Sequence, residues 1–313
     1  MERKPVLTTT EITTELELHV QEPIDGHPLW GSRFLVKDRA ACLKAYQNLI
    51  RSGAGVLMTN TYQATPDAFV KHMGLTEREA ADIFEDSVKI CQQAIELEKK
   101  KGEVSICGAI GSLNALRGDG SEYSGEFCNT YSDQEYLDMH RPRVKALVES
   151  GVDFLCFETL PCSKEALALI GLLEEFPNVK AWISFFGRNT KEISNGETFA
   201  DVAVKCWEKG ENRLLAVGVN CLDPAWVTPL FKSLKAANPN IPFIAYPNSG
   251  EKYDTESKRW TPCDSQKPVA EFLPEWLDMG IAYVGGCCRN YARDLKDMRR
   301  TYDQWTSRRA ALE

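Results

Sequence analysis

The sequence predicts a (β/α)8 TIM barrel formed by a single domain over residues 1–313. Short apolar runs alternate with longer amphipathic segments along the whole chain, as is typical of repeated β-α units around a parallel sheet. Several of the apolar runs lack period-two alternation, which indicates strands covered on both faces. No linker or low-complexity tract interrupts the pattern, so a closed barrel is favoured over a doubly wound open sheet, the main structural alternative.

Eight apolar runs are predicted to be the strands of the barrel. In chain order they are Val6–Thr8, Val56–Met58, Val104–Ala109, Phe154–Phe157, Ala181–Phe186, Leu214–Val219, Phe243–Tyr246 and Ala282–Val284. Each run has the length of a short strand, and each of the first seven is followed by a longer segment that can cross back over the sheet as a helix.

The segments between the strands carry sequence signals for helix ends. Two capping boxes and one Asp-Pro pair predict helix starts, and three glycines predict helix ends. Residues 77–101 also show an apolar stripe at helical spacing, which predicts a helix packed on the sheet. The residues concerned are Thr76 with Glu79, Ser132 with Glu135, Asp223 with Pro224, then Gly102, Gly151 and Gly280, and in the stripe Ile83, Phe84, Val88, Cys91 and Ile95.

The composition argues against several classes of protein. A formal net charge of -8, from 37 Lys and Arg against 45 Asp and Glu, offers no basic surface for nucleic acid. No window reaches the roughly 18 consecutive apolar residues of a membrane span. The first 14 residues hold no apolar signal segment, and the eleven cysteines are an odd number in a long chain. We therefore expect a cytoplasmic protein with reduced thiols.

Functional groups of a (β/α)8 barrel lie where strands end and βα loops begin, so the residues at these positions form the candidate site. Several of them are polar, aromatic or sulfur-bearing, and the fold predicts that they meet at one mouth of the barrel. They are Asn60 and Tyr62 after the second strand, Glu158 after the fourth, Asn220 and Cys221 after the sixth, Tyr246, Asn248 and Ser249 at the seventh, and Cys287 and Cys288 after the eighth.

Three of these residues, Cys221, Cys287 and Cys288, match the ligand count of a catalytic zinc, which leaves the fourth tetrahedral position open. Thiolates also favour zinc over magnesium or calcium. Gly285 and Gly286 precede the pair and are expected to adopt backbone angles closed to other residues, which turns the thiols toward one ion. The alternative is that all are buried small hydrophobes, which is our interpretation of Cys42, Cys91, Cys107, Cys156 and Cys206.

Four motifs in order along the chain have a known counterpart. They are Thr59-Asn60-Thr61-Tyr62-Gln63, Phe157-Glu158-Thr159, Gly218-Val219-Asn220-Cys221 and Gly285-Gly286-Cys287-Cys288. With these motifs the chain, from about Thr14 to Arg299, resembles the homocysteine S-methyltransferase family. The resemblance implies a zinc-dependent barrel in which the three cysteines hold the metal. The stretch from Tyr246 to Glu251 resembles the branch that uses S-methylmethionine or S-adenosylmethionine rather than betaine.

The implied reaction moves a methyl group from a sulfonium donor to the zinc-bound thiolate of homocysteine and gives methionine. A free thiol with a pKa of about 8.5 is mostly protonated at neutral pH, whereas a zinc-bound thiol is deprotonated. The sulfur then attacks the methyl group directly, so no general base is required. Homocysteine and the donor are the expected partners, and neither nucleic acid nor a membrane is expected; the sequence leaves the oligomeric state unknown.

The resemblance also implies roles in substrate binding. Glu158 is expected to receive the ammonium group of homocysteine, and Trp30 lies in a stretch that resembles a loop over the donor site. Asn60, Tyr62 and Asn220 are expected either to bind substrate or to support the metal loops. Thr9, Tyr246, Asn248 and Ser249 complete the predicted substrate-binding set.

The chain departs from the family at the first strand. The family has Asp-Gly-Gly where this chain has Thr9-Thr10-Glu11, and that Asp helps to bind the homocysteine ammonium. With Thr9 in its place, the ammonium is expected to bind mainly to Glu158, because no second carboxylate remains to compensate. The departure leaves open a second function, a zinc-binding pseudoenzyme or thiol sensor that has kept the metal and lost the amino-acid site.

Overall fold

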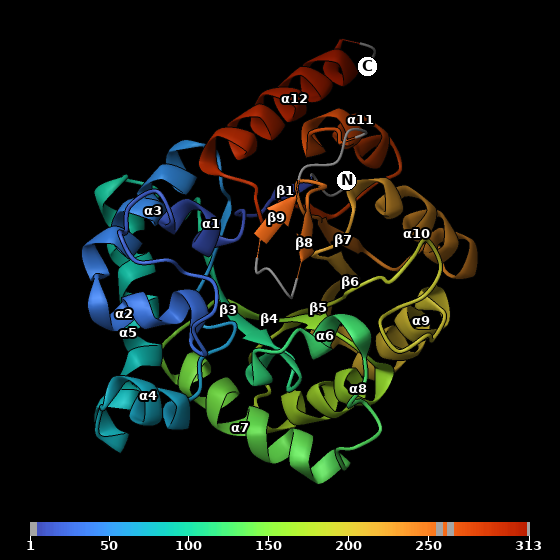
Figure 1. Cartoon of the computed structure of the whole chain (residues 1–313). Coiled ribbons are helices and arrows are strands. Elements are labelled where there is room, and N and C mark those ends of the chain that lie inside the picture. The colour runs from blue at the N-terminus through green and yellow to red at the C-terminus, as the bar shows by residue number, and fades with distance from the viewer. Residues whose placement is uncertain (1–4, 255–258, 262–265, 312–313) are drawn as a thin grey trace.

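The computed structural model describes residues 5–254, 259–261 and 266–311. Eight parallel strands form one sheet in the spatial order β1, β10, β7, β6, β5, β4, β3, β2 (Figure 1). Thr8 bridges Val56, and the Gly55 N–H donates to the Leu7 carbonyl at 2.8 Å, so β1 also meets β2. The sheet therefore closes on itself, which confirms the predicted (β/α)8 barrel and rules out the open sheet.

The strands lie close to their predicted positions. Their bounds are β1 Val6–Leu7, β2 Val56–Met58, β3 Ser105–Gly111, β4 Phe154–Leu160, β5 Ala181–Phe185, β6 Leu214–Asn220, β7 Phe243–Tyr246 and β10 Tyr283–Val284. Because β4 and β6 run further than predicted, Glu158 and Asn220 belong to the last residues of strands and not to loops. An antiparallel hairpin, β8 Lys252–Asp254 and β9 Arg259–Thr261, has no counterpart among the predicted strands.

Helices surround the barrel (Figure 1). The longer ones are α3 Arg39–Arg51, α4 Pro66–Met73, α5 Glu77–Leu97, α7 Asp133–Glu149, α8 Ser163–Leu172, α9 Phe199–Gly210, α10 Pro224–Ala237, α11 Val269–Asp278 and α12 Ala292–Ala310. Three short ones, α1 Ile12–Leu16, α2 Phe34–Lys37 and α6 Ser121–Ser124, lie in βα connections.

The predicted helix starts are confirmed. Both capping boxes form, at Thr76 with Glu79 and at Ser132 with Glu135, and the Asp223 side chain accepts from the Ala225 N–H ahead of α10. Gly151 and Gly280 follow the last residues of α7 and α11 with positive φ, as predicted. The predicted stop at Gly102 is wrong by several residues, because α5 ends at Leu97 and Gly102 belongs to the turn beyond it.

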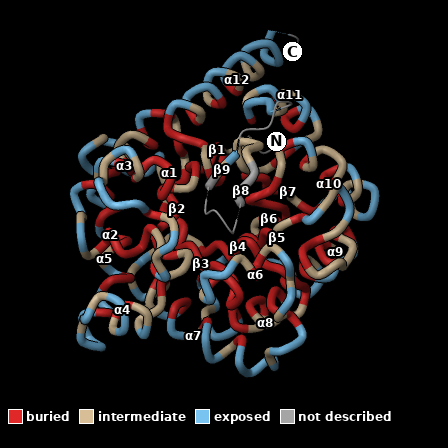
Figure 2. Tube along the Cα trace, in the orientation of Figure 1, coloured by how far each residue is buried: buried red, intermediate tan, exposed pale blue. Residues whose placement is uncertain are grey.

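Two packed layers hold the barrel together. The side chains of β2 alternate between the two layers. Val56 and Met58 belong to the cluster inside the barrel, and Leu57 belongs to the larger cluster under the helices. Trp182 fills the interior with no exposed surface, and its indole N–H donates to the Tyr246 hydroxyl at 3.3 Å. Figure 2 shows the resulting ring of buried chain around the barrel axis. The filled interior confines functional chemistry to a strand end.

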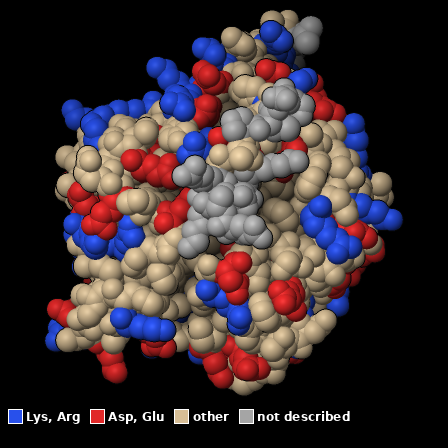
Figure 3. Space-filling model, in the orientation of Figure 1, with Lys and Arg blue, Asp and Glu red and all other residues tan. Residues whose placement is uncertain are grey.

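The surface gives no sign of a large charged partner in the view along the barrel. Lys and Arg are interspersed with Asp and Glu over this face (Figure 3). Within the part of the chain that the structure describes, no helix has the length and apolar character needed to cross a bilayer.

Candidate active site

A cavity opens at the carboxyl ends of the strands, where the sequence places the candidate residues. Its walls come from the ends of strands and from the connections that follow them. The lining residues are Glu11, Ile12, Trp30, Met58, Thr59, Asn60, Tyr62, Ala109, Tyr123, Glu158, Thr159, Asn220, Cys221, Cys287 and Cys288. The cavity therefore brings together residues from six parts of the barrel that are distant in sequence.

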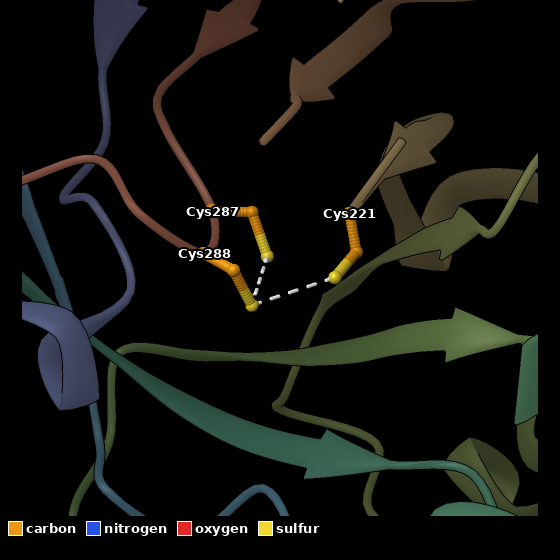
Figure 4. A group of neighbouring side chains, drawn as sticks. All are labelled: Cys221, Cys287 and Cys288. Carbon is orange, nitrogen blue, oxygen red and sulfur yellow. Dashed lines mark hydrogen bonds between the residues drawn. The ribbon is translucent and has the colours of Figure 1, made fainter. Parts of the chain in front are cut away.

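The three predicted metal ligands converge at one side of this cavity (Figure 4). The sulfur of Cys288 lies 3.7 Å from that of Cys221 and 4.0 Å from that of Cys287, and all three sulfurs lie within 4.8 Å of one another. Tetrahedral zinc with Zn–S distances of about 2.3 Å places its sulfur ligands about 3.8 Å apart. The observed spacing and the soft, buried donor set fit one zinc ion.

The thiols also share hydrogen bonds. Bonds with Cys287 and Cys288 lower the pKa of Cys221 well below its ordinary value, and the same contacts raise the pKa of the other two. One thiolate is thus stabilised by two neighbouring thiols. Deprotonation of all three requires a cation among them, which is what a divalent metal supplies.

Unusual backbone angles gather at the site. Five non-glycine residues of the described chain have positive φ, and four of them line the cavity or adjoin a metal ligand: Trp30 (45°), Thr159 (56°), Cys221 (58°) and Arg289 (64°). Such conformations are uncommon and tend to occur at functional sites, where the surrounding structure imposes them. At Cys221 this backbone conformation directs the thiol toward Cys287 and Cys288, on the loop after β10.

The reason predicted for Gly285 and Gly286 is wrong. Neither has φ in the left-handed region. Both are needed for space instead. A Cβ on Gly285 would come within 2.0 Å of Thr8 Oγ1 and 2.5 Å of the Thr9 carbonyl, and one on Gly286 would press on Asn290 at 2.7 Å. The two glycines let the loop that carries Cys287 and Cys288 approach the end of β1.

Glu158 lines the cavity from an irregularity in β4. The register between β4 and β5 shifts between Phe157 and Leu160, and Thr159 adopts positive φ. Bulges of this kind re-aim a side chain at the end of a strand. Glu158 is buried, with 6% of its surface exposed, and burial followed by the charge of Glu11 raises its pKa to about 8. A bound cation would favour its ionised form.

Glu11 is a second carboxylate of the cavity, which the sequence analysis missed. It precedes α1 and accepts from the Thr13 and Thr14 N–H groups at 2.8 and 3.1 Å. Burial raises its pKa to about 7. Thr9, by contrast, is fully buried, has no hydrogen-bond partner for its hydroxyl and does not line the cavity. The expectation that no second carboxylate accompanies Glu158 is therefore wrong. Glu11, two residues after Thr9 in the sequence, also lines the cavity.

Besides Glu158, four of the predicted substrate residues line the cavity, and three of them also support its walls. Asn60 donates to the Gly31 carbonyl at 2.9 Å, and the indole N–H of Trp30 donates to Asp25 at 2.9 Å. Asn220 accepts from the Thr159 N–H at 2.9 Å and donates to the Thr159 hydroxyl at 2.8 Å, which holds the irregular end of β4. Tyr62 is the fourth, and its buried hydroxyl has no hydrogen-bond partner.

The three predicted residues at and after β7 lie outside the cavity wall. Tyr246 is buried in the barrel interior against Trp182 and Ser184. The Asn248 amide donates to the Cys221 carbonyl at 3.0 Å, so it stabilises the loop that carries Cys221. Ser249 donates to Glu251 at 2.9 Å. Their positions assign them support of the site rather than direct contact with a ligand in the cavity.

Tyr123 is a further site residue that the sequence analysis missed. It belongs to α6, and its hydroxyl lies 3.6 Å from the sulfur of Cys221. Its ring meets Phe186 edge-on, with the ring centres 4.9 Å apart. The connection after β3 carries Tyr123 twelve residues beyond the strand end at Gly111, so a search of the residues directly after each strand does not reach it. Glu11, in contrast, is an acidic residue just after the first strand, so the same search could have included it.

Fold and site together define a (β/α)8-barrel enzyme with three clustered thiols that could hold a metal ion, beside an acidic cavity. The model of the homocysteine S-methyltransferase family matches residues 11–302. The chain belongs to this family, whose members are methyltransferases of class EC 2.1.1 that act on homocysteine.

The relatives and solved structures agree with this assignment. The chain is 38% identical to the betaine-homocysteine S-methyltransferase of Drosophila melanogaster, over 96% of this chain and 95% of that one. It is 33% identical to the homocysteine S-methyltransferase of Escherichia coli strain K12, over 91% of each. The metallated form of the E. coli homocysteine methyltransferase MmuM superimposes with a TM-score of 0.82 at 30% identity, over 95% of this chain and 96% of that one.

The metal site yields a direct prediction. We expect one zinc ion per chain, lost on Cys221→Ala, Cys287→Ala or Cys288→Ala, because two thiols cannot hold the ion in a site with an open position. Each variant should still be folded and show a cooperative thermal unfolding transition, since the core of the barrel forms without metal, unlike that of a zinc finger. Metal analysis and melting curves check both points, and Cys42→Ala, a buried thiol under the helices, serves as the control. Full zinc occupancy in Cys288→Ala, or its failure to fold, would contradict the assignment.

Proposed function

We propose that this chain is a zinc-dependent homocysteine S-methyltransferase that takes its methyl group from a sulfonium donor, S-methylmethionine or S-adenosylmethionine. The observation that carries the proposal is the spacing of the three buried sulfurs, which suits one zinc ion, at the wall of a cavity with two carboxylates. Family membership supplies homocysteine as the acceptor. We further propose that residues 1–313 form one homocysteine-binding domain.

Cys221, Cys287 and Cys288 would hold the zinc ion. Zinc at this position would keep the homocysteine thiol deprotonated at neutral pH, where a free thiol is mostly protonated. With the acceptor already a thiolate, the chain needs no general base at the sulfur. Consistent with this, no histidine, lysine or arginine of the described ranges lines the cavity.

Glu158 and Glu11 would bind the homocysteine ammonium group. Both carboxylates have a raised pKa, so each gains from a cation that restores its ionised form. The backbone N–H groups of Thr13 and Thr14 hold the Glu11 carboxylate in place before substrate binds. Preorganised groups of this kind fix the orientation of the amino acid and with it the direction of its sulfur.

Methyl transfer itself is a single displacement. The homocysteine sulfur forms a bond to the methyl carbon while the bond from that carbon to the donor sulfur breaks, and the donor leaves as a neutral thioether. A cationic sulfonium group suits a cavity whose described lining holds two carboxylates, three thiols and no basic residue. The aromatic rings of Trp30, Tyr62 and Tyr123 add faces that attract a cation.

The alternative of a pseudoenzyme or thiol sensor rested on the absence of the first-strand Asp. Glu11 offers a carboxylate to the same cavity, so that argument no longer favours loss of the amino-acid site. We therefore retain the enzyme proposal, which the reaction itself can test.

The reaction is checked with backbone-labelled homocysteine and a panel of unlabelled donors. We expect zinc-loaded protein to form labelled methionine with S-methylmethionine or S-adenosylmethionine, and mass spectrometry follows the label. Betaine is the comparison donor. Labelled methionine from betaine alone would contradict the sulfonium assignment, and none from any donor would favour the sensor.

The two cavity carboxylates give a second prediction. Glu158→Gln and Glu11→Gln should each raise the KM for homocysteine about tenfold to a hundredfold, because a charged hydrogen bond contributes about 1 to 3 kcal/mol. The double variant should be weaker than either single one. Steady-state kinetics with varied homocysteine measure the effect, and Glu174→Gln, an exposed carboxylate after α8, is the control. Unchanged KM values in both single variants would mean that the ammonium binds elsewhere.

A further inference from the structure

Arg143 is a buried cation whose contacts reach the cavity wall, and none of the roles above uses it. It belongs to α7, and its side chain does not line the cavity itself. Burial lowers the pKa of its guanidinium group to about 10. A buried charge is costly unless hydrogen bonds hold it, so the groups that Arg143 contacts indicate its role.

The guanidinium group donates to backbone carbonyls at the ends of two neighbouring strands. Its Nη2 atom donates to the Tyr62 carbonyl at 2.6 Å, on the connection after β2. Its Nη1 atom donates to the Gly111 carbonyl at 3.0 Å, at the end of β3. The Gly111 N–H also donates to the Tyr62 carbonyl, at 3.1 Å. One planar side chain therefore fixes the backbone of a cavity residue relative to the next strand.

The Tyr62 ring is placed by the same strand end. A Cβ on Gly111 would meet the Tyr62 Cε2 atom at 2.4 Å, so the ring lies directly against the Gly111 backbone. The ring also meets Trp30 edge-on, with the ring centres 6.1 Å apart, and both aromatic residues line the cavity. A shift of the backbone that Arg143 holds would therefore move the aromatic part of the cavity wall.

Two further buried residues hold Arg143 in place. Nε2 of His140 lies 2.8 Å from Oε1 of Glu165, and Nδ1 of His140 lies 3.4 Å from Nη1 of Arg143. Burial lowers the pKa of His140, which favours the neutral ring. Because arginine can only donate, Nδ1 accepts and Nε2 carries the proton that is donated to Glu165. The same Glu165 oxygen accepts from the Leu113 N–H at 2.6 Å, so the network also holds the chain just after β3.

We infer that Arg143 is a positioning residue of the methyl-donor site, where it holds the Tyr62 ring in the cavity wall through the carbonyl groups of Tyr62 and Gly111. The inference rests on the proposed function, in which the aromatic rings of the cavity attract the sulfonium donor. It deepens that function by naming the residue that orients one of these rings. Since Arg143 does not line the cavity, it acts on the donor through Tyr62.

Arg143→Lys tests this role with the positive charge kept. A lysine lacks the planar fork that reaches both carbonyls. We expect kcat/KM for S-methylmethionine, or for S-adenosylmethionine if wild type uses only that donor, to fall about tenfold to a hundredfold at saturating homocysteine, since small displacements of positioning groups have effects of this size. The KM for homocysteine should stay close to that of wild type. Arg141→Lys, a partly exposed arginine of α7 paired with Glu175, is the matched control and should match wild type.

A double-mutant cycle with Tyr62→Ala distinguishes positioning from general support of the fold. If Arg143 acts through Tyr62, Arg143→Lys should cause little further loss of kcat/KM in the Tyr62→Ala background, whereas independent effects would multiply. Calorimetric titration of the same donor into wild type, the two single variants and the double variant gives a readout without turnover. The affinities should follow the same non-additive pattern.

Other outcomes would overturn the inference. Unchanged kcat/KM in Arg143→Lys, or losses that multiply in the double variant, would mean that Arg143 does not act through Tyr62. A loss confined to the KM for homocysteine would place its effect at the acceptor site. If Arg143→Lys does not fold, Arg143→Gln, which keeps an amide donor, takes its place, and failure of both to fold would reduce Arg143 to a core residue. Absence of methyl transfer by wild type from every donor would instead defeat the proposed function.

Discussion

The convergence of three sulfurs from two distant strand ends is the interaction on which the rest of the site depends. Cys221 follows β6, and Cys287 and Cys288 follow β10, yet their sulfurs come within 4.8 Å. That approach requires backbone contacts that only glycine permits, since a Cβ on Gly218 would meet the Ile244 carbonyl at 1.8 Å and one on Gly285 would meet Thr8. The packing of the barrel strands thus brings the three thiols together, so we expect their arrangement to form without metal.

The second constraint is charge. Two carboxylates and three thiols line the cavity, and among the residues that the structure describes no basic side chain lines it. Burial disfavours the charged form of the carboxylates, which appears as the raised pKa of Glu11 and Glu158. In the proposed function, cations would relieve this cost: a divalent metal at the sulfurs, and the homocysteine ammonium group at the carboxylates. Substrate binding and stabilisation of the metal-bound thiolate would then both depend on the negative charge of the cavity.

Much of this could be predicted from sequence, and the exceptions have physical reasons. The strands and capping boxes follow from local patterns, and Cys221, Cys287, Cys288 and Glu158 follow from their position at strand ends. The role of Gly285 could not be predicted, because close approach to Thr8 is a long-range contact. The family's Asp aligns with Thr9, but Thr9 does not line the cavity. Glu11 caps the start of α1, and this turn places its carboxylate in the cavity wall instead. Tyr123 lies on a long connection whose path local sequence does not fix.

In the proposed mechanism, three protein thiolates hold a zinc ion whose remaining position accepts the substrate thiol. X-ray absorption at the zinc edge tests it most directly, because the sulfur and the nitrogen or oxygen ligands differ in distance. We expect three sulfur ligands and one lighter ligand in the zinc-loaded protein alone, and four sulfur ligands after homocysteine is added. Four sulfur ligands before the addition, or an unchanged ligand set after it, would contradict this mechanism.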